Sequence, residues 1–253
     1  MGHCGTLDPF ATGLLVLMVG RATRLAPFLT GLDKRYLATV RTGFTSRTGD
    51  TEGPVERSGQ AAAPEAVAAA LPAFVGTLRQ RVPALSAVRV DGERLYRRAR
   101  RGEELADLPE REVTIHSLRL VEDLGDGEYV LEVHCGPGTY VRRLAGDLGE
   151  ALGTGAYCTA LRRTAVGGLS VGDAVGPEEV GPEGGLDPLA GLAHLPRRDL
   201  APDEAAAVVH GRPVAAGPGE DGIVTLVAGG RLVAVGEAGE GAVRPVVVIG
   251  AAA

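Results

Sequence analysis

Apolar positions along the chain follow two periods, which predict a mixture of strands and helices. Alternating or continuous apolar runs bounded by turn residues indicate strands, and we expect them over residues 14–19, 36–41, 82–90, 113–121 and 129–135. Apolar residues spaced by three or four, or runs of alanine, indicate helices, and we expect them over residues 21–29, 64–78, 95–102 and 139–152. Residues 42–60 are rich in Gly, Thr, Ser and Asp, so we expect a loop there.

Turn residues between these segments indicate how they are joined. Asp91-Gly92 is a strong signal for a tight hairpin turn. Gly125-Asp126-Gly127 joins the strands expected at 113–121 and 129–135. Gly153 follows the last helix and is typical of a helix C-terminus. Asp8-Pro9 is typical of a helical turn near the N-terminus, with Asp8 as the cap.

The composition changes near residue 175, which suggests a second module. Residues 175–195 are rich in Gly, Pro and Glu. Beyond them we expect a short helix and three strands, over residues 203–210, 223–227, 232–235 and 243–249. The sequence therefore predicts one domain over residues 1–195 and a small β-rich module over residues 196–253.

Overall composition excludes several classes of protein. The chain has 253 residues, of which 45% are hydrophobic and 23% charged, as is usual for a folded globular protein and unlike a disordered chain. Its apolar runs are too short to span a bilayer, and no basic-then-apolar stretch opens it, so we expect no membrane segment and no secretory signal. Cys4, Cys135 and Cys158 show no CxxC spacing, which predicts reduced thiols, no zinc site and a cytoplasmic protein.

Charge is unevenly distributed along the chain. The net charge is −6, but residues 164–253 carry 12 acidic and 5 basic residues. A basic cluster lies on the helix expected at 95–102 and just before it, and comprises Arg94, Arg97, Arg98, Arg100 and Arg101. Such a cluster can bind nucleic-acid phosphates, although Glu103 and Glu104 follow it and a solvated helix face remains the alternative.

The segment Gly2–Gly13 carries the most specific signal. Taken alone, Asp8 is an ordinary helix cap and His3 an ordinary surface or packing histidine. The whole segment reads GHCGTLDPFATG. It resembles the GHxGTLDPxAxG segment of the TruB family of tRNA pseudouridine synthases and of their RNA-guided relatives.

Other segments resemble this family in the same order along the chain. Lys34–Ala38 resembles its KxYxA strand, and residues 82–100 resemble its VPPxxSAIKVDGxRAYxxAR block. Gly138–Arg142 resembles GTYIR, and Leu161–Thr164 resembles the LRR segment. The resemblance extends from residue 2 to about residue 170. The C-terminal module resembles the small PUA-like RNA-binding domain that follows the catalytic domain in bacterial members.

The resemblance implies a fold and an activity. The fold would be α+β, with a central, mostly antiparallel sheet flanked by helices and a small β-rich C-terminal module. The activity would be conversion of uridine to pseudouridine at position 55 in the T loop of tRNA, after the base is flipped out of its stack. This isomerisation gains no atom and changes no oxidation state, so we expect no cofactor and no metal. The expected partner is the T arm and elbow of tRNA. The sequence shows no coiled-coil pattern and no obvious interface helix, so we expect a monomer.

The resemblance also implies roles for individual residues. Asp8 would be the catalytic aspartate, and Arg142 would pair with its carboxylate. Tyr36 would stack on the target base. Three more residues would contact the flipped nucleotide or the gap it leaves, namely His3, Tyr140 and Leu161. From the residues alone, a core strand position is the favoured interpretation of Tyr36, and a helix-surface position is the alternative for Arg142.

The sequence departs from the family pattern at two places. Family members carry ~30–40 residues before the GHxGTLDP segment, including a strand, whose absence would expose a sheet edge. The loop at 45–53 also differs from the family's TDTxDxxG run. The first departure keeps open an RNA-binding or tRNA-folding module with little catalysis. An RNA-guided synthase acting on ribosomal RNA is a further alternative.

Overall fold

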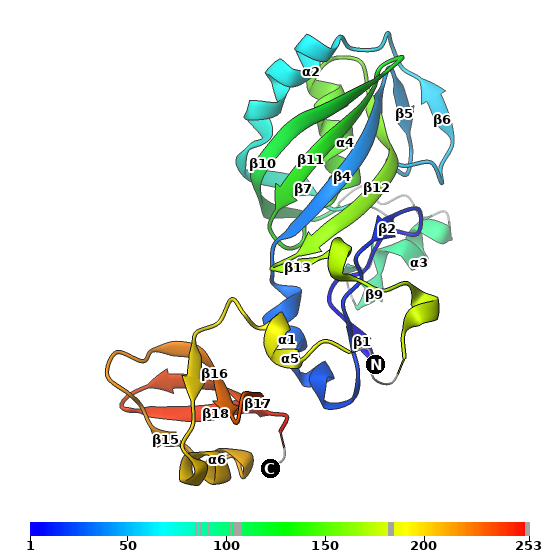
Figure 1. Cartoon of the computed structure of the whole chain (residues 1–253). Helices are drawn as coiled ribbons and strands as arrows, with labels where there is room; N and C mark the ends of the chain where they lie inside the picture. The colour runs from blue at the N-terminus through cyan, green and yellow to red at the C-terminus, as the bar shows by residue number, and fades with distance from the viewer. Residues whose placement is uncertain are drawn as a thin grey trace. The chain divides into compact units, whose positions relative to one another are not determined.

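The computed structural model describes residues 1–83, 85–86, 88–90, 92–101, 103, 108–181 and 185–250 (Figure 1). They fall into two compact units, each of which is discontinuous in sequence. The large-sheet unit comprises Leu7–Leu14 and Leu32–Val166. The small-sheet unit comprises Met1–Thr6, Leu15–Gly31 and the chain from Gly167 onward. The predicted domain division at residue 195 stays a prediction.

An antiparallel sheet forms the framework of the large-sheet unit (Figure 1). Its strands lie in the order β12–β4–β11–β10–β7, and β2 adds to β12 in parallel. The bounds are β2 (Thr12–Gly13), β4 (Lys34–Thr42), β7 (Gly76–Arg81), β10 (Glu110–Gly125), β11 (Glu128–Cys135) and β12 (Ala156–Val166). Each strand of the main series is antiparallel to its neighbours, which confirms the mostly antiparallel sheet that the sequence predicted.

Helices pack on this sheet and complete its core. Helix α4 (Val141–Ala151) buries Val141, Leu144, Ala145 and Leu148, at the spacing expected for one helical face. Helix α2 (Pro64–Ala70) and the 3-10 turn η2 (Leu71–Phe74) contribute Val67 and Leu71 to the same apolar cluster. The remaining elements of the unit are α3 (Leu95–Arg100) and two hairpins, β5 (Phe44–Ser46) with β6 (Val55–Arg57) and β8 (Arg89–Val90) with β9 (Glu93–Arg94).

Four predicted elements differ from the structure. Of the strand expected over residues 82–90, the described residues form a strand only at Arg89–Val90, β8. The helix predicted over residues 64–78 is an α-helix only to Ala70, because Pro72 has no N–H to continue it. A 3-10 turn follows to Phe74, and residues 76–81 pair with β10. The predicted loop 42–60 contains the β5–β6 hairpin. Residues 14–19 form no buried strand: only Leu17–Met18 is a strand, β3, paired with the two-residue β1 (Gly2–His3), and alternate apolar side chains there are exposed.

The small-sheet unit contains a second sheet, and its strands lie in the order β14–β16–β17–β18–β15. The bounds are β14 (Arg197–Asp199), β15 (Val214–Ala215), β16 (Gly222–Ala228), β17 (Arg231–Gly239) and β18 (Ala242–Val248), and α6 (Pro202–Val209) packs on this sheet. The helix and the three strands predicted beyond residue 196 are confirmed. The other elements are η1 (Gly20–Leu25), α1 (Ala26–Thr30), β13 (Leu169–Ser170), η3 (Val171–Asp173), η4 (Pro177–Glu179) and α5 (Pro188–Gly191).

No helix among the described residues is long and apolar enough to cross a membrane. The three cysteines are buried, and no disulfide joins them. Burial raises the pKa of Cys158 to about 12 and that of Cys135 to about 11. Both thiols are therefore protonated at neutral pH, and neither is an available nucleophile.

Candidate active site

Arg142 lies in the first turn of α4, and its side chain is only 4% exposed. The chain before it is fixed by Gln80 on β7, whose side-chain oxygen accepts the Tyr140 N–H at 2.8 Å and whose amide nitrogen donates to the Tyr140 carbonyl at 3.0 Å. The apolar face of α4 then sets the rotation of the helix against the sheet. An arginine buried in this way needs partners for its charge and for its N–H groups.

Asp8 supplies the first partner, from the loop that precedes β2. Arg142 Nε donates to Asp8 Oδ2 at 2.8 Å, and Nη2 donates to Asp8 Oδ1 at 2.8 Å. This bidentate pair fixes the orientation of the carboxylate. The Asp8 side chain remains 28% exposed, so its free edge stays accessible to another molecule. The pairing of Asp8 with Arg142 that the sequence resemblance implied is present in the structure.

The other N–H groups of Arg142 bind the loops on either side of it. Nη1 donates to the Thr48 carbonyl and to Asp50 Oδ2, each at 3.0 Å, and Nη2 also donates to the Leu85 carbonyl at 3.2 Å. All five donors of the guanidinium are therefore used. Burial acts to lower the pKa of Arg142, but the carboxylates of Asp8 and Asp50 outweigh it and raise the pKa. The side chain stays a cation.

Asp50 is a member of this site that the sequence analysis did not single out. It is 1% exposed, and its Oδ1 accepts hydrogen bonds from Thr48 Oγ1 at 2.5 Å and from the Glu52 N–H at 3.0 Å. The loop that carries it is tied to β12, because the Cys158 N–H donates to the Gly49 carbonyl at 3.0 Å. Asp50 balances the charge of Arg142 from the buried side and leaves Asp8 on the accessible side.

The segment after Asp8 is anchored to β12. A turn closes over Pro9 through the hydrogen bond from the Ala11 N–H to the Asp8 carbonyl, and no helix forms there. Gly13 pairs with Arg163, and the Leu14 N–H donates to the Arg163 carbonyl at 2.8 Å. Arg163 Nε returns a hydrogen bond to the Leu14 carbonyl at 2.7 Å. These contacts fix the segment that follows Asp8 to the sheet, and so help to position Asp8 beside Arg142.

Gly13 permits this anchoring, and its replacement tests the role of the anchor. Its φ is +97°, and a Cβ would lie 2.2 Å from the Arg163 carbonyl oxygen. We expect Gly13→Ala to lower the free energy of unfolding by about 1–3 kcal/mol and to reduce activity, because the Asp8 loop must move. Urea unfolding and a turnover assay measure both. Gly168→Ala is the matched control, since a Cβ there meets no atom within 4 Å. Equal effects of the two substitutions would contradict the role of Gly13 in fixing the Asp8 loop to β12.

Tyr36 lies on β4 beside this pair. It pairs in register with Arg163 on β12 and with Val133 on β11, in the middle of the sheet. Burial raises the pKa of Tyr36, although the nearby Arg163 guanidinium acts in the opposite direction; the Asp8 carboxylate adds to the rise. The phenol is therefore neutral at neutral pH and electrostatically coupled to Asp8.

The other predicted nucleotide contacts differ in their surroundings. The ring of Tyr140 lies under the Arg111 guanidinium, 5.6 Å from its carbon to the ring centroid. Leu161 on β12 is buried in the main core, opposite Ala38 on β4. His3 belongs to the small-sheet unit, where it pairs with Leu17 and is exposed. Their roles as nucleotide contacts stay predictions.

Two of the three basic-cluster arginines whose side chains the structure describes are paired with acidic side chains of the same region. Arg98 binds Glu103 at 2.8 Å, and Arg101 binds Glu93 at 2.5 Å and Glu103 at 2.6 Å. Arg97 is exposed, and its Nε donates to the Tyr96 hydroxyl at 3.4 Å. Asp91, Gly102 and Glu104, and the side chains of Arg94 and Arg100, lie outside the described residues. Phosphate binding by this cluster stays a prediction.

A cleft of about 630 Å³ borders the site on the side of Arg142 that faces the β5–β6 hairpin. Its lining includes Thr45, Thr48, Arg81 and Arg143 besides Arg142. Arg143 forms an ion pair with Asp147, one turn further along α4, with 2.5 Å between Nη2 and Oδ1. The lining combines arginine and hydroxyl side chains with the apolar residues Val82, Pro83 and Leu85. A mixed, partly basic surface of this kind can accommodate a strand of nucleic acid.

The sequence of this chain matches three family models, which together cover most of its length. Residues 1–141 match the family model "TruB family pseudouridylate synthase (N terminal domain)". Residues 142–181 match "tRNA pseudouridylate synthase B C-terminal domain", and residues 195–250 match "tRNA Pseudouridine synthase II, C terminal".

Two relatives in sequence are proteins named tRNA pseudouridine synthase B. The one from Parasynechococcus marenigrum (strain WH8102) is 45% identical over 242 residues, which cover 93% of this chain and 82% of the relative. The one from Thermobifida fusca (strain YX) is 44% identical over 260 residues, which cover 98% of this chain and 88% of the relative.

Two solved structures share the fold. A structure of an H/ACA RNP bound to a substrate RNA containing 2'-deoxyuridine matches with a TM-score of 0.69 at 21% identity, covering 100% of this chain and 76% of that one. A Cbf5-Nop10-Gar1 complex matches with a TM-score of 0.65 at 23% identity, covering 94% of this chain and 69% of that one. At these identities the likeness is one of fold.

Proposed function

The chain belongs to the TruB family of pseudouridylate synthases, and on this basis we propose that it isomerises uridine to pseudouridine in tRNA, at position 55 of the T loop. The protein acts as a monomer on the T arm. The observation that carries the proposal is the partly exposed Asp8 carboxylate, held at both oxygens by a buried arginine.

The reaction breaks the C1′–N1 bond of uridine, turns the uracil and forms a C1′–C5 bond. The hydrogen on C5 leaves as a proton, N1 gains a proton, and no other atom is exchanged. Asp8 acts at the sugar, where an ionised carboxylate assists the departure and the return of the base. Arg142 holds the carboxylate at both oxygens and orients it, and Asp50 prevents the guanidinium from turning away.

Uracil within a folded RNA loop is stacked and must leave its stack to reach Asp8, at a cost of a few kcal/mol. Tyr36 supplies a replacement surface, since base–aromatic stacking contributes ~1–3 kcal/mol per base. Burial holds its phenol neutral, so the ring stacks on the base without placing a second anion beside Asp8.

Two substitutions at Tyr36 separate stacking from proton transfer. We expect Tyr36→Leu to lower kcat/KM by about tenfold or more, because it removes ~1–3 kcal/mol of stacking. Tyr36→Phe keeps the ring and is expected to retain most of the binding, so any loss in that variant falls on kcat. Steady-state kinetics with a tRNA transcript measure both. Equal loss of kcat/KM in the two variants would contradict stacking as the main contribution.

The position of the modification is tested by mapping. A tRNA transcript is incubated with the protein, treated with a carbodiimide that marks pseudouridine, and read by primer extension. We expect one stop, at the T-loop uridine, and none in a transcript that carries cytidine there. A stop at another uridine, or several stops, would overturn the assignment to the T loop.

The same reaction mixture tests the RNA-guided alternative. It contains the protein and one transcript, and no guide RNA. Modification under these conditions supports a stand-alone enzyme. Activity that appears only after a complementary guide RNA is added would favour the RNA-guided alternative.

A further inference from the structure

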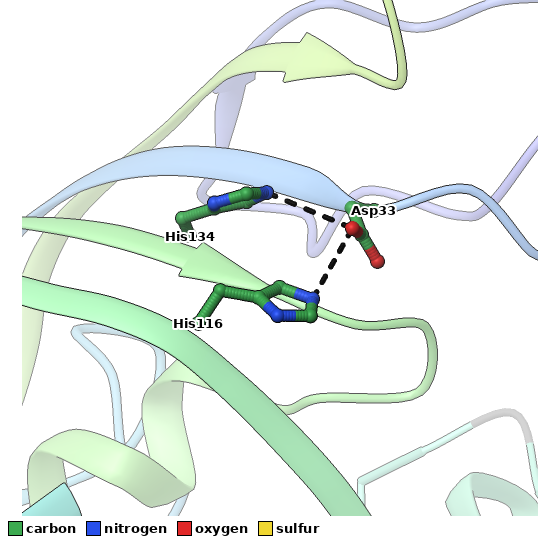
Figure 2. A group of neighbouring side chains, drawn as sticks. All are labelled: Asp33, His116 and His134. Carbon is green, nitrogen blue, oxygen red and sulfur yellow. Dashed lines mark ion pairs between the residues drawn. The ribbon is translucent and has the colours of Figure 1, made fainter. Parts of the chain in front are cut away.

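Two histidines and one aspartate converge on the large sheet, in a cluster with no part in the proposed reaction. Asp33 lies just before β4, His116 on β10 and His134 on β11, so two adjacent strands and the residue that leads into a third contribute one side chain each. Both imidazoles point toward the Asp33 carboxylate (Figure 2). The Nε2 atoms of His116 and His134 lie 3.1 Å and 3.7 Å from the same oxygen, Asp33 Oδ2.

A bulge in β10 produces this convergence. Ile115 pairs with Cys135 and Ser117 pairs with His134, so His116 is an extra residue between two successive pairs. An extra residue of this kind redirects its side chain relative to a regular ladder. As a result the two imidazole rings lie 4.6 Å apart between centroids, at 45° to each other.

We propose that Asp33, His116 and His134 form a binding site for one divalent transition-metal ion of the zinc type. Imidazole and carboxylate are the usual non-sulfur ligands of zinc, with bonds of about 2.0–2.2 Å. Ligand atoms around a tetrahedral ion at such bond lengths lie about 3.3 Å apart. The three candidate atoms lie within 4.8 Å of one another, and two of the separations are already near that value. Small rotations of the side chains complete the site.

The exposure of the cluster suits this kind of site. The side chains of Asp33, His116 and His134 are 45%, 37% and 24% exposed. An ion can therefore enter from solvent, and water can fill the fourth position. The absence of paired cysteines, from which the sequence analysis predicted no zinc site, does not bear on a ligand set of nitrogen and oxygen.

Arg35 sets a limit on the affinity. It pairs with His134 in the β4–β11 register, and its positive charge acts on that imidazole. The charge opposes a bound cation, whereas the Asp33 carboxylate favours one. The balance predicts a site that binds metal reversibly and can be emptied by a chelator.

The test measures Zn²⁺ binding by the full chain in equilibrium dialysis, after chelator treatment. We expect one Zn²⁺ per chain for the unchanged protein. His116→Ala and His134→Ala, singly and together, should weaken binding by about tenfold or more. His194→Ala and His210→Ala, exposed histidines outside the cluster, are matched controls and should leave binding unchanged. Circular dichroism confirms that each variant is folded.

A second readout identifies the ligands directly. Co²⁺ added in place of Zn²⁺ should give visible absorption bands that are lost in the His116→Ala/His134→Ala double variant. Asp33→Asn keeps the size of the side chain and should weaken Zn²⁺ binding as the histidine variants do. The proposal is overturned if the unchanged protein binds no more Zn²⁺ than the double variant, or if the control variants lose binding equally. None of these measurements depends on tRNA modification.

Discussion

Asp8→Asn is expected to abolish pseudouridine formation while leaving the chain folded. The amide has nearly the size of the carboxylate, so its oxygen can still accept one hydrogen bond from Arg142. It carries no charge and cannot assist departure of the base from the sugar. We expect kcat to fall by about 10²–10⁴-fold, which is the order of the contribution that a positioned catalytic carboxylate makes to the rate.

The control for Asp8→Asn is Asp126→Asn. Asp126 lies in the exposed turn between β10 and β11 with a φ of +51°, a conformation that asparagine also adopts. It removes the same charge from the same unit and should leave the rate unchanged. Tritium release from tRNA labelled at C5 of uridine measures both variants, and binding to unlabelled tRNA shows that the Asp8 variant is intact. Full activity in Asp8→Asn would remove Asp8 from the mechanism.

Arg142→Lys is expected to damage stability and activity together. Lysine keeps the charge, but its single ammonium cannot reproduce the planar contacts with Asp8, Asp50 and two backbone carbonyls. At least one buried acceptor loses its partner, which costs about 1–3 kcal/mol. We expect the free energy of unfolding to fall by that amount, and kcat to fall by about a hundredfold because Asp8 is no longer held at both oxygens.

Arg143→Lys provides the comparison at the next residue of α4. Its side chain is 40% exposed and binds Asp147 at the surface, so the change should alter the free energy of unfolding by less than about 1 kcal/mol. Urea unfolding and tritium release on both variants separate the two arginines. Similar losses in the two variants would mean that a general effect on the helix, and not the guanidinium network, explains the result.

The contact between Asp8 and Arg142 was predictable because each residue lies in a specific motif. Asp50 was missed because it lies in a polar loop where composition indicates only a turn-rich segment. Its burial depends on the hydrogen bonds of Thr48 and Glu52 and on the approach of Arg142 from 92 residues away. Local sequence carries no signal for such a contact. The cluster of Asp33, His116 and His134 depends likewise on strand order and on one bulge.

Secondary structure was predictable where the apolar period and the turn residues agree. Helix α4 and strands β10 and β11 meet that condition and lie where the sequence placed them. The predictions for residues 14–19 and 64–78 were wrong for different reasons. In residues 14–19, the apolar run pairs only with the two-residue strand β1, so much of the run is exposed. In the second, helix-favouring alanines precede Pro72, and pairing with β10 makes residues 76–81 a strand.

The most direct test of Asp8-dependent isomerisation is tritium release by the 253-residue chain, acting on a tRNA transcript labelled at C5 of uridine. Formation of the C1′–C5 bond must expel the tritium from the modified uridine to solvent. We predict release equivalent to one uridine per tRNA, without any added cofactor, and a rate that depends on Asp8 and Arg142. Tight binding of tRNA with no release of tritium would contradict this mechanism, and would identify the protein as an RNA-binding module in place of an enzyme.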